Sequence, residues 1–531
     1  MASFDHVILG GGSAGCVVAG QLSADPSRRV LLLEVGDPAE RHPETLRADG
    51  YKDAFVNPAL LHERYSVPQA GCRGRSIFVG TGRGLGGSGS VNAMVYLRGS
   101  AADFRAWRVP GWAWEDVVPD FEALEAVLDV HQRAPTDFTE NCIFAAEQVG
   151  FHRASDLNRG DLCGALGYEW MNYAGERRRS SYVAMIEPHL GRGNLVVETG
   201  ARVHRILFDG ERRARAVEYE VGGSLRTVGV RGEVVLCAGA LETPKILMLS
   251  GVGPAEELRR HEIPVVHDAP AIGQGLRDHP NVTLFFRGRR PVDCNYPQLY
   301  GFHRVRPESA LDRDQADTCY VFYPARSSLR EAMIRMLPAM ALTPRMRSIA
   351  AIPALLRGSV RVAFKAAAVR RFVDKVYGIT VILGRPESRG SLRLRGVDPR
   401  DHAIIDPAYF AEPADMESMI RGVRLARRIA GAEPLRRFGN RELIPGARSR
   451  SDRRIRAFVE RNAMTTFHFA STCSMGQEDS APVDPRLRLR GVEGVRVADA
   501  SVMPEVPVSA LNAPSMLIGW RAAKYLAEDH G

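Results

Sequence analysis

The first 36 residues contain the feature that most constrains the fold, a glycine-rich turn between an apolar strand and a helix pattern. The strand pattern covers Val7 to Leu9, the turn covers Gly10 to Gly15, and a second strand pattern, Val30 to Leu33, ends at Glu34. The first glycine permits a tight turn, the third lets the backbone approach a pyrophosphate, and the last lets the helix lie close to the strand. The chain is therefore predicted to open with a Rossmann-like unit that binds an adenine dinucleotide.

The acidic residue after the second strand narrows the choice of dinucleotide. Glu34 lies 19 positions beyond Gly15, close to the spacing of about 20 residues at which such units carry a carboxylate for the ribose hydroxyls. A carboxylate there disfavours a 2′-phosphorylated ribose, so NADP is the poorest candidate among NAD, NADP and FAD. This motif alone leaves NAD and FAD open.

The composition is that of a globular protein with more than one lobe. The 531 residues are 45% hydrophobic and 25% charged, and the chain is too long for one growing core. The formal net charge of +9 does not indicate a nucleic-acid partner, because only five of the 71 basic residues are lysine and no basic run contains interleaved aromatic residues. We therefore expect no binding of nucleic acid.

The eight cysteines are scattered and include no CxxC pair and no Cys/His ligand spacing. This pattern predicts no metal site and fits free thiols in a reducing compartment. The first strand begins almost at Met1, which leaves no room for a signal peptide, and no apolar run is long enough to span a bilayer. The sequence thus favours a cytoplasmic protein.

Several later segments repeat the strand, turn and helix pattern. A glycine-rich loop leads into a helix-compatible stretch within residues 82–96, and an apolar strand over 234–240 precedes a helix over 242–250. Residues 495–501 are predicted to form a strand with a carboxylate at its end, and the last helix is expected over 512–527. The nucleotide-binding sheet is therefore predicted to combine segments far apart in the sequence, while the stretches between them form a second lobe.

Four separated segments together resemble the glucose-methanol-choline (GMC) oxidoreductases, which are FAD-dependent alcohol oxidases and dehydrogenases. Residues 82–99 are similar to the first family signature and residues 239–253 to the second. The stretch 465–476 and the tail 499–512 complete the pattern in the family's order. The resemblance implies that FAD is the dinucleotide.

The resemblance also implies the architecture, an α/β fold (α+β overall) with a Rossmann-like FAD-binding lobe and a substrate lobe built on a large antiparallel sheet backed by helices. The FAD-binding lobe would be discontinuous, with residues 1–155, 196–290 and 455–531. The substrate-binding lobe would take residues 156–195 and 291–454, with approximate boundaries.

The residues of the site follow from the same resemblance, with His468 and Asn512 as the catalytic pair. Within the cofactor site, Val203 would meet the adenine through its backbone and Asp499 would reach the ribityl side. Val91 stands where some relatives carry a histidine bonded to the flavin, so FAD is expected to bind non-covalently. The implied cofactor-binding residues are Gly10, Gly12, Ser13, Ala14, Gly15, Glu34, Gly84, Gly87, Asn92, Ala93, Met94, Val95, Val203, Asp499, Ala500, Asn512 and Ala513.

Oxidation of an alcohol needs a base for the hydroxyl proton and an acceptor for the hydride. Histidine suits the base, because its ordinary pKa of about 6.5 leaves much of it neutral near pH 7. We expect oxidation of a primary or secondary alcohol to the carbonyl, with His468 as general base, Asn512 hydrogen-bonded to the substrate oxygen and hydride transfer to flavin N5. Oxygen or another acceptor would reoxidise the flavin. A flavin-containing lyase and a photodecarboxylase on the same fold stay open as alternatives.

Two positions near the expected base depart from the family pattern. The family usually has glycine at position 471 and often proline at 469, whereas this chain has Ser471 and Phe469. Together with Phe467 they place bulk beside His468. The substrate of a relative therefore cannot be transferred directly to this chain.

Residues 325–375 are the least family-like part of the chain. They contain eleven arginine or lysine residues against one glutamate and one aspartate, interspersed with four methionines. One interpretation is an amphipathic cover that makes weak contact with a membrane surface, or that admits an apolar or anionic substrate. The other is a helical cap with solvated arginines and methionines that fill gaps in the core. We favour the helical cap, because arginine is common throughout the chain.

Overall fold

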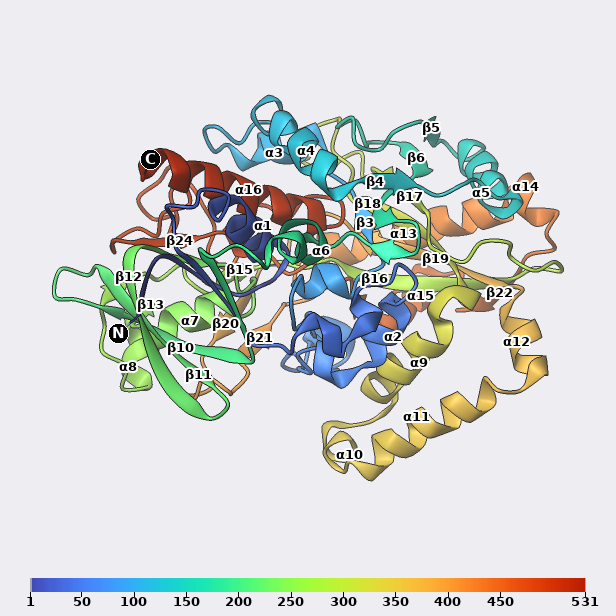
Figure 1. The fold of residues 1–531 in the computed structure, drawn as a ribbon. Coiled ribbons are helices and arrows are strands. Elements are labelled where there is room, and N and C mark those ends of the chain that lie inside the picture. Colours follow the sequence, from blue (N-terminus) through green and yellow to red (C-terminus); the bar gives the residue numbers. More distant parts are fainter. Residues whose placement is uncertain (1, 531) are drawn as a thin grey trace.

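The computed structural model describes residues 2–530, apart from the side chains of Ala339 and Pro344. Figure 1 shows a mixed sheet close to both chain termini and, beside it, a large antiparallel sheet. The two sheets have separate hydrophobic cores. This α/β architecture confirms the fold expected from the sequence.

The first sheet combines strands from both ends of the chain, as predicted. Its central strands are parallel and almost completely buried, with runs of valine, leucine and isoleucine that are typical of strands covered on both faces. The strands are β10 (Ala201–Phe208), β11 (Ala214–Val221), β12 (Ser224–Leu236), β1 (Ser3–Leu9), β2 (Val30–Glu34) and β9 (Leu195–Thr199) in spatial order, with β24 (Val495–Val497) beside β12.

Two helices from opposite ends of the chain pack together on this sheet. They are α1 (Ser13–Leu22), which follows the glycine turn, and α16 (Asn512–Asp529), which is the last helix (Figure 1). The helix α7 (Thr243–Leu249) follows β12 after a short turn, as the sequence predicted. The starts of all three helices therefore lie near the ends of the parallel strands.

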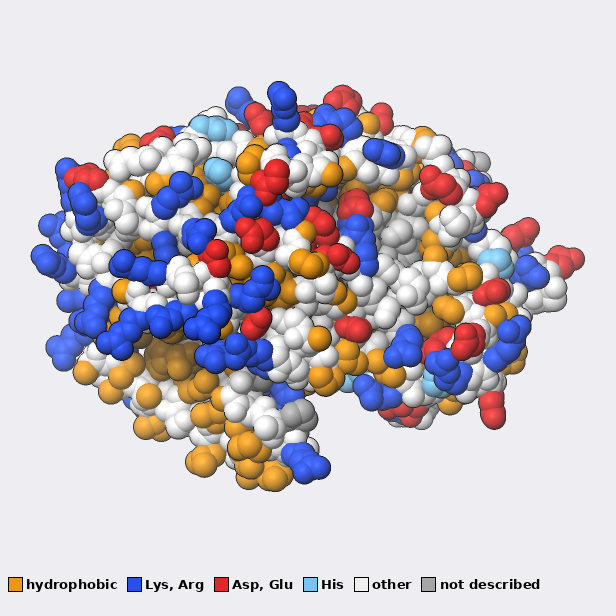
Figure 2. Space-filling view, turned by 180° about the vertical axis from the view of Figure 1, so that it is seen from behind, with side chains coloured by type: hydrophobic (Ala, Val, Ile, Leu, Met, Phe, Trp, Pro, Cys, Tyr) orange, Lys and Arg blue, Asp and Glu red, His pale blue; other side chains and the backbone are white. Residues whose placement is uncertain are grey.

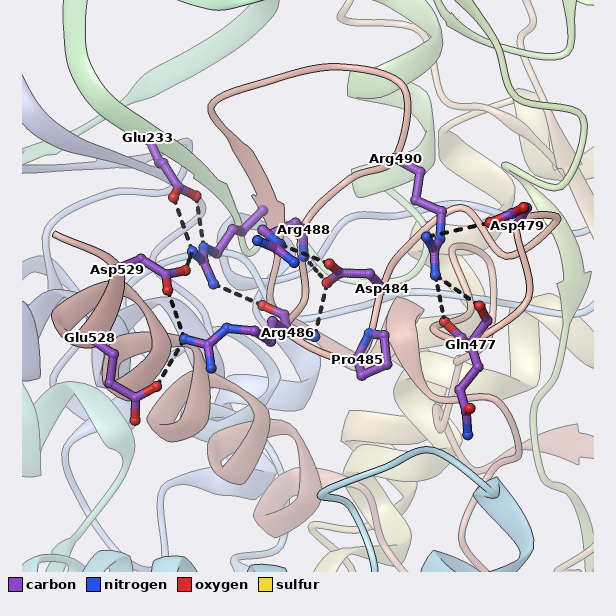
Figure 3. A network of polar contacts seen from close by, with 12 residues as sticks. Glu233, Gln477, Asp479, Asp484, Pro485, Arg486, Arg488, Arg490, Glu528 and Asp529 are labelled. Carbon is purple, nitrogen blue, oxygen red and sulfur yellow. Dashed lines mark hydrogen bonds and ion pairs between the residues drawn. The ribbon is translucent and has the colours of Figure 1, made fainter.

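A network of charges fixes the C-terminal helix to the sheet (Figure 3). The buried Arg496 on β24 donates to Glu233 on β12 at 2.7 and 3.0 Å, and also to Asp529 at the end of α16. Arg486 donates to Asp529 at 2.8 Å and to Glu528 at 2.9 Å. Since a buried guanidinium is costly without partners, these contacts hold β12, β24 and α16 in one arrangement.

The second sheet is the large antiparallel one, in which β5–β6 is the one parallel pair among the described strands. The helix α13 (Pro413–Gly431) covers it, with the apolar side chains of the helix packed against those of the central strands. The strands are β22 (Arg441–Ile444), β16 (Pro280–Arg287), β19 (Val376–Leu383), β18 (Thr318–Pro324), β17 (Leu299–His303), β6 (Ala165–Tyr168) and β5 (His152–Ala154), with β23 (Met464–Thr465) beside β16.

This topology bears on where the substrate-binding lobe begins and ends. Strand β16 pairs with β19 inside the large sheet, and α15 (Asp452–Asn462) contributes Ile455 and Phe458 to the core of that sheet. The substrate-binding lobe that we propose therefore includes residues 280–287 and all of α15, whereas the sequence placed residues 280–287 and 455–462 with the FAD-binding lobe.

The stretch after the second glycine loop is not helical, so the helix-compatible interpretation of residues 91–96 was wrong. Gly87–Ser90 form one 3-10 turn, and Met94 has a left-handed φ of 68°. The Asn92 side chain accepts the Met94 N–H at 2.9 Å, a local bond that competes with helix formation. The chain then enters β3 (Val95–Tyr96), which pairs with β7 (Trp170–Ala174).

Residues 325–375 form four helices below the large sheet in Figure 1. They are α9 (Ala325–Ala341), α10 (Pro344–Ser348), α11 (Ala351–Ala363) and α12 (Ala367–Val373). Among residues 2–530, none of the helices is both long and apolar enough to cross a membrane.

Candidate active site

A cavity lies at the carboxyl ends of β1, β2 and β12, where nucleotide sites form in sheets of this type. Five residues of the implied cofactor set line it: Gly10, Gly12, Glu34, Gly87 and Val203. The pairing of β10 with β11 is irregular directly after Val203, so this backbone departs from a regular ladder where the adenine contact is expected.

The glycine turn has the geometry that the motif predicts. Gly10 has a φ of 105°, and a Cβ there would lie 2.7 Å from the Cys237 carbonyl oxygen. A Cβ on Gly15 would lie 1.9 Å from the Gly10 carbonyl oxygen. A Cβ on Gly12 would lie 3.7 Å from the Cys237 carbonyl oxygen, which is an ordinary van der Waals distance. Helix α1 starts without a side-chain cap and without an acidic residue in its first turn. An anion could therefore bind the N–H groups of Ser13 and Ala14 at this helix start.

Glu34 joins the two glycine-rich loops. One carboxylate oxygen accepts the Gly11 N–H at 2.8 Å, and the other accepts the N–H groups of Gly36 at 2.8 Å and Gly84 at 2.9 Å. A carboxylate has about four lone-pair positions, so one remains on the oxygen that faces Gly11. A ribose hydroxyl fits this position. Together with the uncapped helix start, it suits the ADP half of a dinucleotide.

A charged cluster beside this cavity was missed from the sequence. Glu242 forms ion pairs with Lys245 at 2.7 Å and with the buried Arg64, which also donates to Thr81. Burial by itself raises the pKa of Glu242, but Lys245 and Arg64 outweigh it and lower the pKa to about 2. The only signal in the sequence was the position of Glu242 and Lys245 in the second family signature. Arg64 had none.

The loop expected to line the flavin is held by Arg178, a second residue that the sequence analysis missed. This buried guanidinium donates to the Gly89 carbonyl at 2.9 Å, to the Asn92 Oδ1 at 2.7 Å and to the Asn92 carbonyl at 2.6 Å. Burial lowers the pKa of Arg178 to about 9. The loop from Gly87 to Val95, including Ala93, is thus fixed by a side chain about 90 residues away.

Asn512 and Asp499 lie on the C-terminal tail. The Ser13 hydroxyl donates to the Asn512 Oδ1 at 2.9 Å, and no hydrogen bond to the Asn512 amide nitrogen is found among the described residues. The buried Asp499 accepts the Gly239 N–H at 2.9 Å and the Thr243 hydroxyl at 2.6 Å, and burial raises its pKa. Two implied neighbours follow these residues directly, Ala500 in a 3-10 turn and Ala513 in the buried first turn of α16.

His468 lies in a buried polar cluster. Its Nδ1 is 2.9 Å from the Nδ1 of His279, and its backbone N–H donates to the Asp278 carboxylate at 2.7 Å. Burial lowers the pKa of His468 to about 4 and lowers that of His279 as well. Both rings are therefore neutral near pH 7. His279 is thus a direct partner of the expected base.

The structure brings His468 and Asn512 to the same loop without joining them by a hydrogen bond. A Cβ on Gly89 would touch the Asn512 Oδ1 at 2.9 Å, and Val91 packs in one apolar cluster with Phe467, the neighbour of His468. Gly89 in this loop therefore lies beside Asn512, and Val91 lies near the residue that precedes His468.

An apolar and aromatic cluster borders His468 on the side of Phe467. The Phe467 ring lies 6.0 Å from that of Phe55 and 6.1 Å from that of Phe78, both edge-to-face. The other members of the cluster are Leu61, Tyr65, Val91, Met336, Met340 and Met464. Two of these methionines come from α9, as the helical-cap interpretation expects, but Arg335 of this helix is buried rather than solvated.

Comparison with known proteins gives the family. Family models described as GMC oxidoreductase match residues 4–281 and residues 386–519. The chain is 32% identical to the alcohol dehydrogenase [acceptor] of Pseudomonas putida, over 98% of this chain and 95% of that protein. It is 33% identical to the mitochondrial choline dehydrogenase of Homo sapiens, over 98% of this chain and 89% of that protein.

A solved structure has the same fold over its whole length. The crystal structure of pyridoxine 4-oxidase from Mesorbium loti covers all of both chains with a TM-score of 0.83 and 28% identity. Both family models match this chain, and the relatives align with nearly all of it. These matches assign the chain to one family. The chain belongs to the GMC oxidoreductases, flavoenzymes that act on the CH–OH groups of alcohols.

Proposed function

We propose that this protein oxidises a primary or secondary alcohol to the carbonyl, with His468 as the general base and non-covalent FAD. The observation that carries the proposal is the half-buried His468, neutral near pH 7, whose Nδ1 meets the Nδ1 of His279 at 2.9 Å. Such a bond holds one proton. When His468 donates it, the Nε2 of His468 keeps a free lone pair and can accept the proton of the substrate hydroxyl.

His279 would also stabilise the charged base. Once His468 holds the substrate proton, its Nδ1–H still donates to the lone pair of His279, which spreads the new charge in a buried site. The backbone bond to Asp278 fixes the position of His468 in the chain. His279 and Asp278 are thus positioning residues in this proposal.

Asn512 would orient the substrate oxygen. Because the Ser13 hydroxyl donates to the Asn512 Oδ1, the amide nitrogen keeps its N–H groups for another acceptor. These groups can donate to the oxygen of the alcohol as negative charge develops on it. When bound, FAD supplies the acceptor for the hydride that leaves the carbinol carbon. Val91 has no nucleophile, which supports a non-covalent cofactor.

The cluster around Phe467 supports an apolar alcohol as the substrate. The aliphatic or aryl part of an alcohol would gain by burial among the aromatic rings and methionines of this cluster. The guanidinium groups of Arg335 and Arg347, which lie over two of these rings, would repel a quaternary ammonium head. A panel of alcohols should therefore give the highest kcat/KM for apolar members. Equal values for glycerol and an aliphatic alcohol of similar size would contradict this part of the proposal.

The test of the proposed reaction is flavin reduction in the dark. The purified protein should be yellow, and its flavin absorbance should fall when an alcohol is added without oxygen. His468→Ala should slow this reduction by about 100-fold to 10,000-fold, because a positioned base contributes that much. His152→Ala, at an exposed histidine, is the matched control.

Two results would count against the proposal. Unchanged reduction in His468→Ala would refute the base. If no alcohol reduced the flavin in the dark while the protein turned over a cyanohydrin or an illuminated carboxylic acid, the lyase or photodecarboxylase alternative would replace it. The rate at which oxygen restores the absorbance would distinguish an oxidase from a dehydrogenase that uses another acceptor.

A further inference from the structure

The helices α10, α11 and α12 form an arm, residues 344–373, that stands off the body of the protein (Figure 1). Figure 2 shows hydrophobic side chains gathered over this arm, with a band of lysine and arginine side chains above them. The arm continues from α9, which packs on the apolar cluster beside Phe467. The outer surface of the arm, in contrast, exposes large hydrophobic side chains to solvent.

Large hydrophobic side chains are exposed on the arm. Twelve large hydrophobic side chains are exposed among the described residues, and the arm contributes five: Met346, Ile349, Leu355, Val362 and Phe372. Leu355 is 77% exposed and Val362 is 66% exposed, the two highest values of the twelve. Single exposed apolar residues are normal on a protein surface, but a cluster of them indicates an interaction site.

Helix α11 is apolar on two opposite faces. Pro353 and Val360 are buried on the face that packs against α9. Ala351, Leu355, Gly358 and Val362 follow one another at spacings of four, three and four residues, so they share a single stripe on the outer face. A surface helix that needs only one apolar face is expected to be polar on the other. The outer stripe is therefore suited to a second apolar contact.

The charge around this stripe has one sign. The arm contains seven arginine or lysine residues and no aspartate or glutamate, in a chain whose formal net charge is +9. Arg361, Lys365, Arg370 and Arg371 are exposed, and Arg357 reaches Glu63 at 3.3 Å. The partner of this surface must therefore combine an apolar layer with negative charge.

We propose that the arm binds to the surface of an anionic lipid bilayer. The outer stripe of α11 would enter the boundary of the acyl chains, and the basic residues would meet the lipid phosphates. With 13 residues α11 is too short to span a bilayer, so it would lie in the plane of the interface. A second copy of this chain is a poorer occupant, because pairing two arms would bring together like charges.

This inference goes beyond the proposed reaction, although it bears on access to the site. Arg347 of α10 lies over the Tyr65 ring at 4.2 Å, and Tyr65 packs 5.7 Å from Phe78 in the cluster that contains Phe467. The chain of contacts from the arm therefore reaches the neighbour of the expected base. An apolar alcohol dissolved in the bilayer would be close to the site when the arm is bound.

The test is co-sedimentation of the FAD-loaded protein with vesicles of phosphatidylcholine alone and of phosphatidylcholine mixed equally with phosphatidylglycerol. The wild-type protein should bind the anionic vesicles about tenfold or more tightly than the neutral ones, and added salt should weaken the binding. Leu355→Ser with Val362→Ser should lower binding about tenfold. Replacing Arg361, Lys365, Arg370 and Arg371 by glutamine should lower it similarly, on anionic vesicles only.

The matched control removes exposed apolar side chains elsewhere. Val397 is 59% exposed and Leu225 is 58% exposed, and Val397→Ser with Leu225→Ser should bind vesicles like the wild type. All variants should keep the yellow colour and the dark reduction by alcohol, which separates failure of this inference from failure of the proposed reaction. Absence of wild-type binding to anionic vesicles would overturn the inference. A dimer in solution that Leu355→Ser with Val362→Ser converts to a monomer would also overturn it.

Discussion

Burial sets the pH range in which His468 can act. A base with its pKa near 4 is neutral throughout the physiological range, and it loses function only as the pH falls through that value. We therefore expect the rate of anaerobic flavin reduction to be constant from about pH 6 to 9 and to fall below about pH 5. Stopped-flow absorbance at saturating alcohol would measure it. A midpoint near 6.5, the value of a free histidine, would show that burial does not control this base.

Ser471 occupies a backbone conformation that favours glycine. Its φ is 72°, its side chain is buried, and its hydroxyl has no hydrogen-bond partner among the described residues. A glycine at this position, as the family pattern has it, would adopt this conformation without strain. Ser471→Gly should raise the free energy of unfolding by about 1 kcal/mol, because it removes both the strain and the unpaired hydroxyl. Ser471→Ala, which keeps the Cβ, should gain less in chemical unfolding of the FAD-loaded protein. An equal gain would exclude the backbone explanation.

At the scale of elements, one arginine fixes the loop that is expected to line the flavin. Lysine cannot reproduce the fork by which Arg178 holds Gly89 and Asn92. Arg178→Lys should therefore weaken FAD binding by about tenfold or more in a titration of the apoprotein. Arg177→Lys is the control, since its exposed side chain forms an ion pair with Glu187 on the surface. The same FAD affinity in both variants would show that the loop does not depend on this contact.

The segment 325–375 is rich in arginine, methionine and aliphatic residues, yet its helices α9 and α11 lie in different environments. In α9, Met336 is buried and Met340 packs against the apolar cluster, so this part is a cap over the site. In α11, Leu355 and Val362 point away from the body. The helical-cap interpretation therefore fits α9, whereas membrane contact is what we propose for α11.

For the molecule as a whole, buried neutral histidines make stability depend on pH. Burial lowers the pKa of His6 to about 4, that of His62 to about 3 and that of His468 to about 4. In the unfolded chain each would titrate near 6.5. Below this pH the unfolded state binds protons that the folded state does not, so stability is complete above pH 6.5 and is lost as the pH falls toward 4.

Between about pH 6.5 and about 4, each of these histidines should lower the free energy of unfolding by about 1.4 kcal/mol for every unit by which the pH falls. The Tm should accordingly fall between pH 7.5 and 5 in thermal scans of the FAD-loaded protein. His6→Gln should make the decrease smaller, whereas His152→Gln, at an exposed position, should leave it unchanged. A Tm that stays constant over this range would contradict the role of the buried histidines.

Local patterns were enough to predict the nucleotide-binding unit. The turn from Gly10 to Gly15, the strand that ends at Glu34 and the helix after Asn512 all depend on residues close in sequence, whose conformational needs are the same in any fold. Residues 91–96 were predicted wrongly, because the side chain of Asn92 and the pairing of β3 with β7 override the helix pattern.

By itself the sequence determined the dinucleotide-binding turn and the family, since these depend on motifs whose residues lie close together in the chain. The large antiparallel sheet was expected only because the resemblance implies it. Only the tertiary structure decided which partners the buried charges take. Glu34 accepts the N–H of Gly84, Arg178 holds Asn92, and His279 meets His468 across 189 positions. A buried polar group is stable only when a partner lies within about 3 Å, and that distance is set by the packing of elements that the sequence order does not reveal.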